Sequence, residues 1–263
     1  MNSGYNRTDA IVLNTTDYGE SDRIVTFFTA DYGKVAGIAK GARRSKKRFV
    51  NKLEPFSHIT LTVFHKEGRQ LVRIEECRLI ENFHHLKENL EKLAYGSYLL
   101  ELLGTMTREG EEQEGLFTLL LATLRVLEEA EEPEKWALIF ETKLLSLLGY
   151  RPRLDRCVIC SRLTDGTKYY FSSHRGGAVC GGCRGGLSEL IPISVGTARF
   201  LDAVASMEFS KMGRLIANPV VMEESTAALR NFVRYYTGRD LKTRQFLDRI
   251  GGVDHEIRGR TGC

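Results

Sequence analysis

The first third of the chain alternates apolar and polar side chains with the two-residue period of strands that bury one face. The clearest example is residues 57–65, where Ile59, Leu61 and Val63 share one face. The pattern predicts five strands, over residues 8–13, 22–30, 34–39, 57–65 and 70–82. Five strands in so short a stretch, with one long loop after the third, predict a small closed barrel of the oligonucleotide-binding (OB) type.

From residue 83 the apolar period changes to 3.6 residues, which predicts helices. The first is expected to be continuous over 86–104, with Leu86, Leu90 and Leu93 on its buried face. Further helices are predicted over residues 116–129, 133–148, 195–207 and 225–236. Ser194 is expected as an N-cap, and Gly149 and Gly238 as C-terminal stops. The predicted fold class is therefore α+β, with an N-terminal barrel and a helical C-terminal domain.

Two Cys-x-x-Cys pairs interrupt the helical part, and 19 residues separate them, namely residues 161–179. This spacing is typical of a zinc site in which two tight turns each direct two sulfurs at one ion. We expect the ligands to be Cys157, Cys160, Cys180 and Cys183, with one structural Zn²⁺ per chain. Four thiolates close the coordination shell and leave no position for a catalytic water.

Three alternatives to this zinc site remain open: a redox pair, two unrelated thiol pairs, and a site in which His174 replaces one cysteine. Gly181 and Gly182 favour the zinc site, because a tight turn there is expected to need positive φ. Of the two other cysteines, Cys77 is expected to be a buried thiol in a strand and Cys263 is near the chain end. Six cysteines, four of them in metal spacing, fit a reducing cytoplasm better than a disulfide scaffold.

Charge is unevenly distributed along the 263 residues. Residues 1–80 hold 14 basic and 9 acidic side chains, a net +5, whereas residues 81–150 hold 6 and 14, a net −8. Residues 151–263 hold 18 and 11, a net +7. Two basic regions around an acidic one indicate a nucleic-acid-binding protein whose middle does not touch the nucleic acid. No apolar run is long enough to span a membrane, and the N-terminus lacks the apolar core of a signal peptide.

The strongest basic cluster lies in the predicted loop after the third strand. No acidic residue occurs between Tyr32 and Leu53, whereas eight cations do. The candidate DNA-binding residues in this window are Lys34, Lys40, Arg43, Arg44, Lys46, Lys47 and Arg48. Such cations release counterions from phosphates, and Phe49 beside them is expected to stack on a base. The alternative is a solvated basic loop without a partner.

The acidic middle holds two groups of glutamates, Glu109, Glu111, Glu112 and Glu114, then Glu128, Glu129, Glu131, Glu132 and Glu134. Paired carboxylates can act in acid–base catalysis, but these stand at helix ends and loops without an apolar pocket, so we expect them to be solvated. No glycine-rich phosphate loop and no catalytic Ser/His/Asp or Cys/His arrangement is visible. The sequence therefore gives no sign of ATP hydrolysis.

Several segments resemble the RecO family of bacterial recombination mediators and DNA-repair proteins. The matching segments are 8–13, 18–25, 29–34, 40–44 and 241–247. The most specific piece is Thr-Ala-Asp-Tyr-Gly-Lys at 29–34, followed by Lys-Gly-Ala-Arg-Arg at 40–44. The order of parts also agrees over nearly the whole chain: small barrel, helical bundle, four-cysteine insert and a second helical part.

The resemblance implies a non-enzymatic protein that binds single- and double-stranded DNA and anneals complementary strands. Such proteins work with RecR, and in some species RecF, to load RecA onto DNA coated by single-strand-binding protein. Among the family's DNA-contacting positions, the basic residues that fall in the matching segments are Lys34, Lys40, Arg43 and Arg44. The expected location is cytoplasmic, at the nucleoid.

The expected domain order is an OB-type barrel, a first helical part, a zinc insert, a second helical part and a loose tail. The expected boundaries are 1–82, 83–150, 151–190, 191–250 and 251–263. One alternative function is an RNA-binding or ribosome-associated zinc-ribbon protein. Another is a zinc-dependent nucleic-acid enzyme, which needs an open metal position that four cysteines do not leave.

Overall fold

The computed structural model describes residues 1, 3–164 and 168–250. The chain forms two compact units, Met1–Pro133 and Glu134–Cys263. Both contain helices and strands, which confirms the α+β class. The expected tail 251–263, with Cys263, lies outside the described residues. None of the helices within the described ranges has the length and apolar character that a membrane crossing requires.

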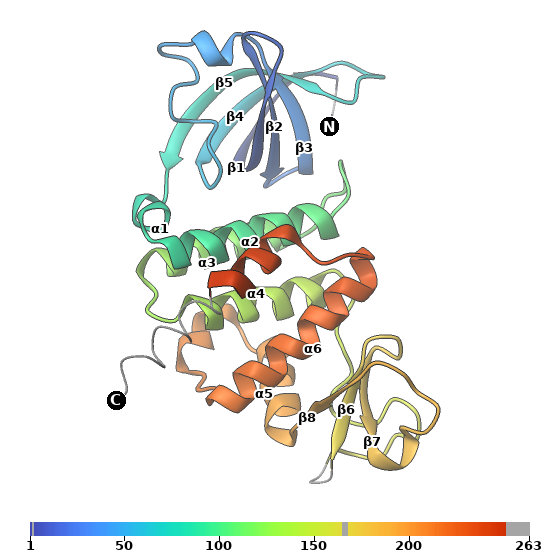
Figure 1. Ribbon diagram of the computed structural model, residues 1–263. Helices are drawn as coiled ribbons and strands as arrows, with labels where there is room; N and C mark the ends of the chain where they lie inside the picture. The colour runs from blue at the N-terminus through green and yellow to red at the C-terminus, as the bar shows by residue number, and fades with distance from the viewer. Residues whose placement is uncertain (2, 165–167, 251–263) are drawn as a thin grey trace, which may run out of the picture. The chain divides into compact units, whose positions relative to one another are not determined.

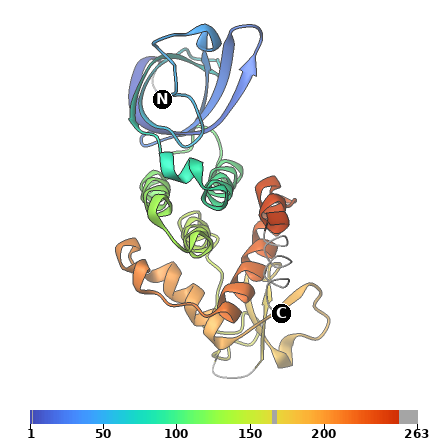
Figure 2. The same ribbon diagram turned by 60° about the vertical axis from the view of Figure 1, so that its left-hand side comes forward.

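The first unit begins with a closed five-stranded barrel (Figure 1). Its strands are β1 (Gly4–Tyr18), β2 (Asp22–Thr29), β3 (Gly33–Ala39), β4 (His58–His65) and β5 (Val72–Glu81). The strand order around the barrel is β1-β2-β3-β5-β4, and the turned view in Figure 2 shows the strands closing into a ring. The predicted OB-type barrel is thereby confirmed.

The barrel closes because β1 is long enough to pair with two strands. Its first half pairs with β4, its second half pairs with β2, and the register shifts between Val12 and Asn14. Ile59, Leu61 and Val63 of β4 are buried inside the barrel, as their alternation predicted. Burial of each such side chain contributes about 1.5–3 kcal/mol to the free energy of unfolding.

The helices of the first unit are α1 (His84–Glu88), α2 (Leu90–Met106) and α3 (Leu116–Glu129). The prediction of one continuous helix over 86–104 is wrong. The helix is interrupted at Asn89, which has an extended backbone. The Asn89 side chain accepts a hydrogen bond from the backbone N–H of Lys92 at 3.0 Å and so caps α2. The break also rotates the buried face, so that Leu90 is exposed whereas Leu99 is buried.

Helix α2 packs against the barrel within this unit. A Cβ atom on Gly96 would lie 2.9 Å from the ring of Phe56, so the glycine lets that ring approach the helix. On α3, Leu120, Leu124 and Leu127 are fully buried, as predicted. The barrel and these three helices therefore share one packed body.

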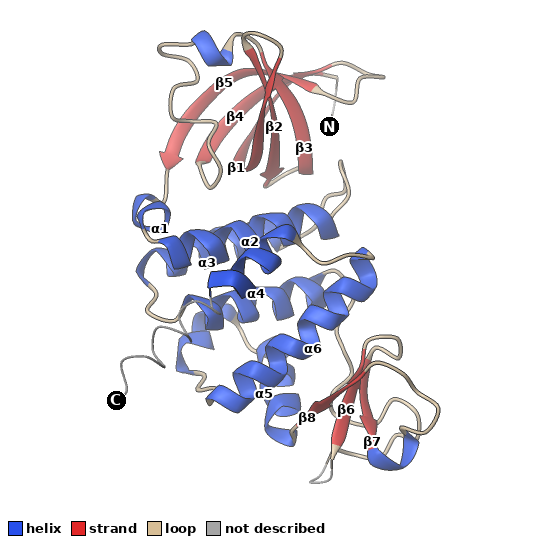
Figure 3. Ribbon diagram, viewed as in Figure 1, coloured by secondary structure: helices blue, strands red, loops and turns tan. Residues whose placement is uncertain are grey.

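The second unit combines helices with a small sheet (Figure 3). Its helices are α4 (Pro133–Leu147, which begins at the boundary), α5 (Val195–Ser206) and α6 (Pro219–Thr237), and residues 242–250 are also helical. Its strands are β6 (Tyr169–Ser172), β7 (Gly177–Cys180) and β8 (Leu190–Ile193), in the order β7-β6-β8. Short 3₁₀ turns are η2 (Gly181–Cys183) and η3 (Phe209–Arg214).

The predicted helix ends are largely correct in this unit. Ser194 caps α5 by accepting from the backbone N–H of Thr197 at 3.1 Å, and Gly238 ends α6 with φ +71°. Helix α6, however, begins six residues before the predicted residue 225, because Asn218 caps it and Pro219 starts it. The signal for this earlier start was present in the sequence.

Candidate metal centre and nucleic-acid interface

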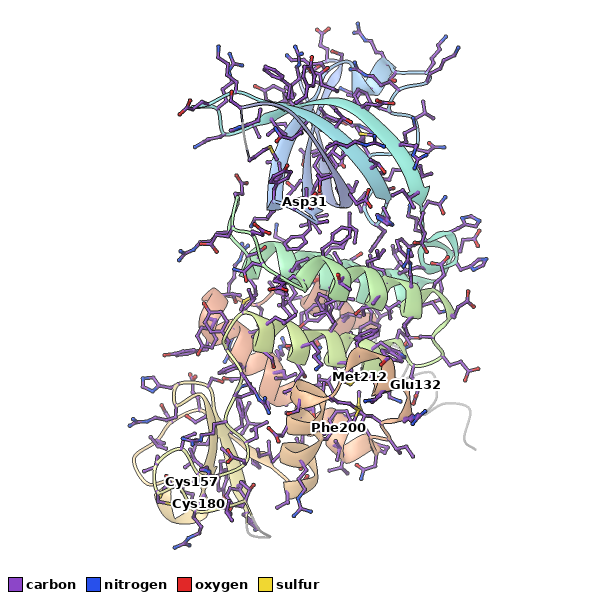
Figure 4. All side chains as sticks on the ribbon, turned by 180° about the vertical axis from the view of Figure 1, so that it is seen from behind. Asp31, Glu132, Cys157, Cys180, Phe200 and Met212 are labelled. Carbon is purple, nitrogen blue, oxygen red and sulfur yellow. The ribbon has the colours of Figure 1, made fainter. Side chains whose placement is uncertain are left out.

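The four cysteines converge on one point of the second unit. Cys157 and Cys160 belong to the segment before β6, Cys180 ends β7, and Cys183 ends η2. Their Sγ atoms all lie within 4.8 Å of one another, and Figure 4 shows Cys157 beside Cys180. The Cys160 and Cys180 sulfurs are 3.7 Å apart. This distance is close to the roughly 3.8 Å edge of a tetrahedron with Zn–S bonds of about 2.3 Å.

The backbone around the cluster favours thiolate. The N–H of Cys180 donates to the Cys157 sulfur at 3.4 Å. Burial opposes ionisation of Cys157, but the backbone N–H groups of Cys160, Cys180 and Ile159 outweigh it and lower its pKa to about 6. Contacts with the Cys180 and Cys160 side chains raise the pKa of Cys183 to about 12. A bound dication relieves this conflict, because it holds all four sulfurs as thiolates.

The donor set therefore fits a metal ion, and among the described residues it is the one group of metal-ligating side chains that converges in this way. His174, the alternative ligand, lies outside the cluster with its ring against Tyr235. The expectation of positive φ at Gly181 and Gly182 is wrong, since both lie in the right-handed turn η2. The left-handed residue near the first cysteine pair is Ser161, with φ +59°.

The basic loop, defined here as residues 40–52, lies beside the β1–β2 turn at one end of the barrel (Figure 1). The backbone N–H of Arg43 donates to the carbonyl of Ser21 at 2.9 Å. The Arg43 guanidinium also donates to the carbonyl of Gly19 at 3.0 Å and pairs with Asp17 at 3.3 Å. The root of the loop is therefore tied to the barrel.

Asp22 organises the start of the loop. Its carboxylate accepts from the backbone N–H of Gly41 at 2.8 Å and pairs with Lys40 at 3.2 Å. These contacts, the Gly41 hydrogen bond first, lower the pKa of Asp22. Arg44 lies 3.5 Å from Glu20, but both side chains are exposed, so this pair contributes little. The acids at and beside the β1–β2 turn, namely Asp17, Glu20 and Asp22, thus balance the first cations of the loop.

The tip of the loop is more strongly cationic. Lys46 and Lys47 are exposed and form no ion pair with any described residue. The Arg48 guanidinium donates to the backbone carbonyl of Lys40 at 2.8 Å. The Lys52 ammonium donates to the backbone carbonyl of Arg48 at 3.0 Å. The expected base-stacking role of Phe49 is wrong, because its ring is buried in the barrel core beneath the Arg48 guanidinium.

Lys34 is used inside the protein. Its ammonium donates to the carbonyls of Gly104 and Thr107 at the C-terminal end of α2, at 2.6 Å for Gly104. Burial lowers the pKa of Lys34, and the nearby Glu109 carboxylate opposes that effect. The remaining candidates Lys40, Arg43, Arg44, Lys46, Lys47 and Arg48 are gathered in the basic loop, apart from Lys34.

The acidic segments have more structure than the sequence indicated. Glu128 accepts from the backbone N–H groups of His85 and Leu86 at 3.0 and 3.2 Å, and so caps α1 from α3. The backbone of Gly110 donates to the carbonyl of Lys34 at 2.9 Å. The expectation that these glutamates are solvated is therefore wrong for Glu128, whereas Glu109, Glu111, Glu112 and Glu114 are exposed as expected.

One surface group was missed by the sequence analysis. Tyr5 is 70% exposed, and its ring lies edge-on to Phe64 with centroids 5.2 Å apart. The Arg73 guanidinium lies 5.6 Å from the centre of the Phe64 ring. The alternation of β4 already placed Phe64 outside the barrel, but only the β1–β4 pairing brings Tyr5 beside it.

The fold and the site together define a class of protein with an OB-type barrel, a helical region and a four-cysteine cluster able to hold a metal. The chain belongs to the RecO family. The family model for the recombination protein O N terminal matches residues 1–83, and the model for the C terminal matches residues 87–245. These matches support a role in DNA repair and recombination.

Curated relatives agree over almost the full length of both chains. The chain is 37% identical to the DNA repair protein RecO of Syntrophus aciditrophicus over 93% of this chain and 95% of the relative. It is 36% identical to that of Pelotomaculum thermopropionicum over 93% and 94%. It is 34% identical to that of Anaeromyxobacter dehalogenans over 92% and 95%.

Proposed function

We propose that this chain is a DNA-binding recombination mediator that anneals complementary strands and helps RecR to load RecA in the RecF pathway. The observation that carries the proposal is the match of both halves of the chain to the two family models. Single- and double-stranded DNA are its proposed ligands. RecR, single-strand-binding protein and, in some species, RecF are its proposed protein partners, and the cytoplasmic nucleoid is its proposed location.

The proposed DNA surface is the basic loop, residues 40–52. Lys46 and Lys47 at its tip have no acidic partner among the described residues, so their charge is available to phosphates. Arg43, Arg44 and Lys40 lie beside Asp17, Glu20 and Asp22, and a phosphate has to compete with those acids. Neutralising two strands lets them approach and pair, and this step needs no ATP. Lys34 is left out, because it binds the end of α2.

The proposed metal is one structural Zn²⁺, held by Cys157, Cys160, Cys180 and Cys183. Zinc in such a closed site contributes folding free energy rather than Lewis-acid chemistry. Its proposed role is to fix the segment before β6 against β7 and η2.

The proposed activity is binding and annealing without cleavage. Cleavage of a phosphodiester needs a metal-bound water or paired carboxylates near the DNA. Glu128 already binds the backbone N–H groups at the start of α1. Residues 81–150, with a net charge of −8, as a whole repel phosphate. We expect no cleavage of end-labelled single- or double-stranded DNA over hours with Mg²⁺. Mg²⁺-dependent cleavage that disappears on changing Glu111 and Glu112 would contradict this.

The decisive experiment is an annealing assay with complementary DNA strands, with and without RecR and single-strand-binding protein. We expect the protein to accelerate pairing of naked strands and, with RecR, of coated strands. Matched RNA strands serve as the comparison. A protein that binds RNA more tightly than DNA and does not accelerate pairing would be the RNA-binding zinc-ribbon protein instead.

A further inference from the structure

A polar cavity of about 440 Å³ opens in the second unit, between the β6–β7 turn, residues 186–189 and the last turn of α6. It is lined by Ser172, Ser173, His174, Arg175, Gly186, Leu187, Ser188, Glu189 and Tyr235. Its size is in the range of small-molecule and nucleotide sites. No cysteine is among its lining residues, so it is distinct from the metal cluster.

The walls of the cavity are held together by specific contacts. The Ser173 hydroxyl lies 2.7 Å from the Asn231 side-chain oxygen and joins the β6–β7 turn to α6. Below it, Phe171 packs edge-on to Phe232 with ring centroids 5.4 Å apart. These contacts hold the β6–β7 turn against α6, so two of the three walls of the cavity have a fixed arrangement.

Two of the residues that line the cavity, His174 and Tyr235, carry aromatic rings. Tyr235 is 49% exposed, and the ring of His174 lies 5.9 Å from it, edge-on. An exposed aromatic ring is a platform on which an unstacked base can stack, and such stacking tolerates any base. The ring of Tyr236 supports that of Tyr235 edge-on, with centroids 5.3 Å apart, and itself packs against Tyr150 and Phe232.

The turn also presents a cation. Arg175 is exposed and forms no ion pair with any residue that the structure describes. Its backbone N–H donates to the Ser172 hydroxyl at 3.3 Å, and Gly176, with φ +70°, closes the turn. The backbone of Arg175 is therefore held in place. A guanidinium so placed suits a phosphate. Glu189, the one carboxylate in the lining, is an acceptor for a base amino group.

We propose that this cavity binds a nucleotide of single-stranded DNA, with the base against Tyr235 and the phosphate at Arg175. The proposal rests on the proposed function and extends it, because it gives the chain a strand-binding site in the second unit besides the basic loop of the first. Two such sites on one chain suit a protein that brings two strands together. A duplex does not enter the cavity, since its bases are stacked inside the helix.

The test compares Tyr235→Ala, Tyr235→Phe and Arg175→Ala in the full-length, metal-loaded protein. Binding of a fluorescent thymidine oligonucleotide and of a duplex of equal length is measured by anisotropy. Loss of one stacked base lowers affinity by about 10-fold. We expect that loss for Tyr235→Ala on single strands only, and wild-type affinity for Tyr235→Phe. An oligonucleotide carrying 5-iododeoxyuridine should cross-link to Tyr235 or His174.

Wild-type single-strand affinity in Tyr235→Ala, at unchanged metal content, overturns the proposal. Equal weakening in Tyr235→Phe and Tyr235→Ala also overturns it, because the ring would then not be what binds. If the basic-loop variants still weaken DNA binding in either case, the proposed function stands and only this site fails. If the wild-type protein binds neither probe, both proposals fail.

Discussion

The ammonium nitrogen of Lys34 lies 2.6 Å from the carbonyl oxygen of Gly104 and so joins β3 to the C-terminal end of α2. The same ammonium also binds the carbonyl of Thr107. The last carbonyls of a helix have no intrahelical donor and carry the negative end of its dipole, which a cation stabilises. Lys34, which belongs to a basic window in the sequence, therefore links the barrel to the C-terminal end of α2.

Replacement of Lys34 by Met should lower the free energy of unfolding by about 2 kcal/mol, because the carbonyls lose a charged donor. The matched control is Lys40→Met, which removes an exposed lysine paired with Asp22 and should cost less than about 1 kcal/mol. Urea denaturation followed by circular dichroism measures both. A Lys34→Met protein of wild-type stability with weakened DNA binding would instead return Lys34 to the DNA surface.

Purified protein should contain one zinc per chain by elemental analysis. Cys160→Ser should lose the metal and loosen residues near the cluster, since metal binding there is coupled to folding. Cys77→Ala is the control, because Cys77 is buried in the barrel, where burial raises its pKa to about 12. Full zinc content in Cys160→Ser, or none in gently purified wild type, would rule out the four-thiolate site.

The double change Lys46→Ala and Lys47→Ala should weaken DNA binding with little sequence dependence. It should flatten the slope of log affinity against log salt by about 1.5, at roughly 0.7–0.9 for each phosphate contact. Adding Arg43→Ala and Arg44→Ala should bring the total to about 3 if all four contact phosphate. An unchanged slope would remove the basic loop from the interface.

The control for this salt dependence is Arg108→Ala with Arg125→Ala, which removes the same charge from the first unit outside the basic loop. These arginines pair with Glu111 at 3.7 Å and Glu81 at 3.0 Å. Their loss should leave the slope unchanged. Equal flattening in both double variants would show that net charge, rather than the loop, determines affinity.

Gly33→Ala should be strongly destabilising. Gly33 has φ +61°, and a Cβ there would lie 2.0 Å from the carbonyl oxygen of Glu111. The added atom must push the 109–112 segment away from β3, at a cost of about 3 kcal/mol including the left-handed backbone. Gly19→Ala is the control, since Gly19 has φ +59° but open space, and should cost about 1 kcal/mol. Thermal unfolding that ranks the two variants equally would contradict the clash.

His58 should make the first unit sensitive to mild acid. Its ring is buried beside Phe117, and neither ring nitrogen has a hydrogen-bond partner among the described residues, although Nδ1 lies 3.9 Å from a carboxylate oxygen of Glu81. Burial lowers the pKa of His58, and the Asp9 and Glu81 carboxylates oppose that effect. Below the unfolded value of about 6.5, the unfolded chain takes up a proton that the folded chain resists. This contribution to stability is therefore present above about pH 6.5 and is lost as the pH falls toward the folded pKa.

The measurement is the urea midpoint between pH 5 and 8 for the wild type and His58→Gln. The variant should be less stable at pH 8 but less dependent on pH. His84→Gln, at an exposed position paired with Glu88, is the control and should retain the wild-type pH dependence. A wild-type profile in His58→Gln would assign the acid sensitivity to other groups.

Features that depend on local period and spacing could be predicted from the sequence. Alternation along β4 showed which face of the strand is buried, and the two-residue spacers of the cysteine pairs showed which sulfurs meet. The caps at Ser194 and Gly238 were also visible, because a cap is made within three or four residues of the helix end. These interactions are short-range, so they can be predicted from residues that are close together in the sequence.

The tertiary structure alone decided which partner each long polar side chain takes. A lysine looks the same in sequence whether its partner is a phosphate or a carbonyl 70 residues away, as for Lys34 and Gly104. Likewise, Phe49 lies in a basic run, yet barrel closure buries its ring, and Glu128 lies in an acidic run, yet it caps α1. Each of these outcomes depends on which surfaces meet when distant segments pack, and the free energy of burial and hydrogen bonding, rather than the local pattern, selects among them.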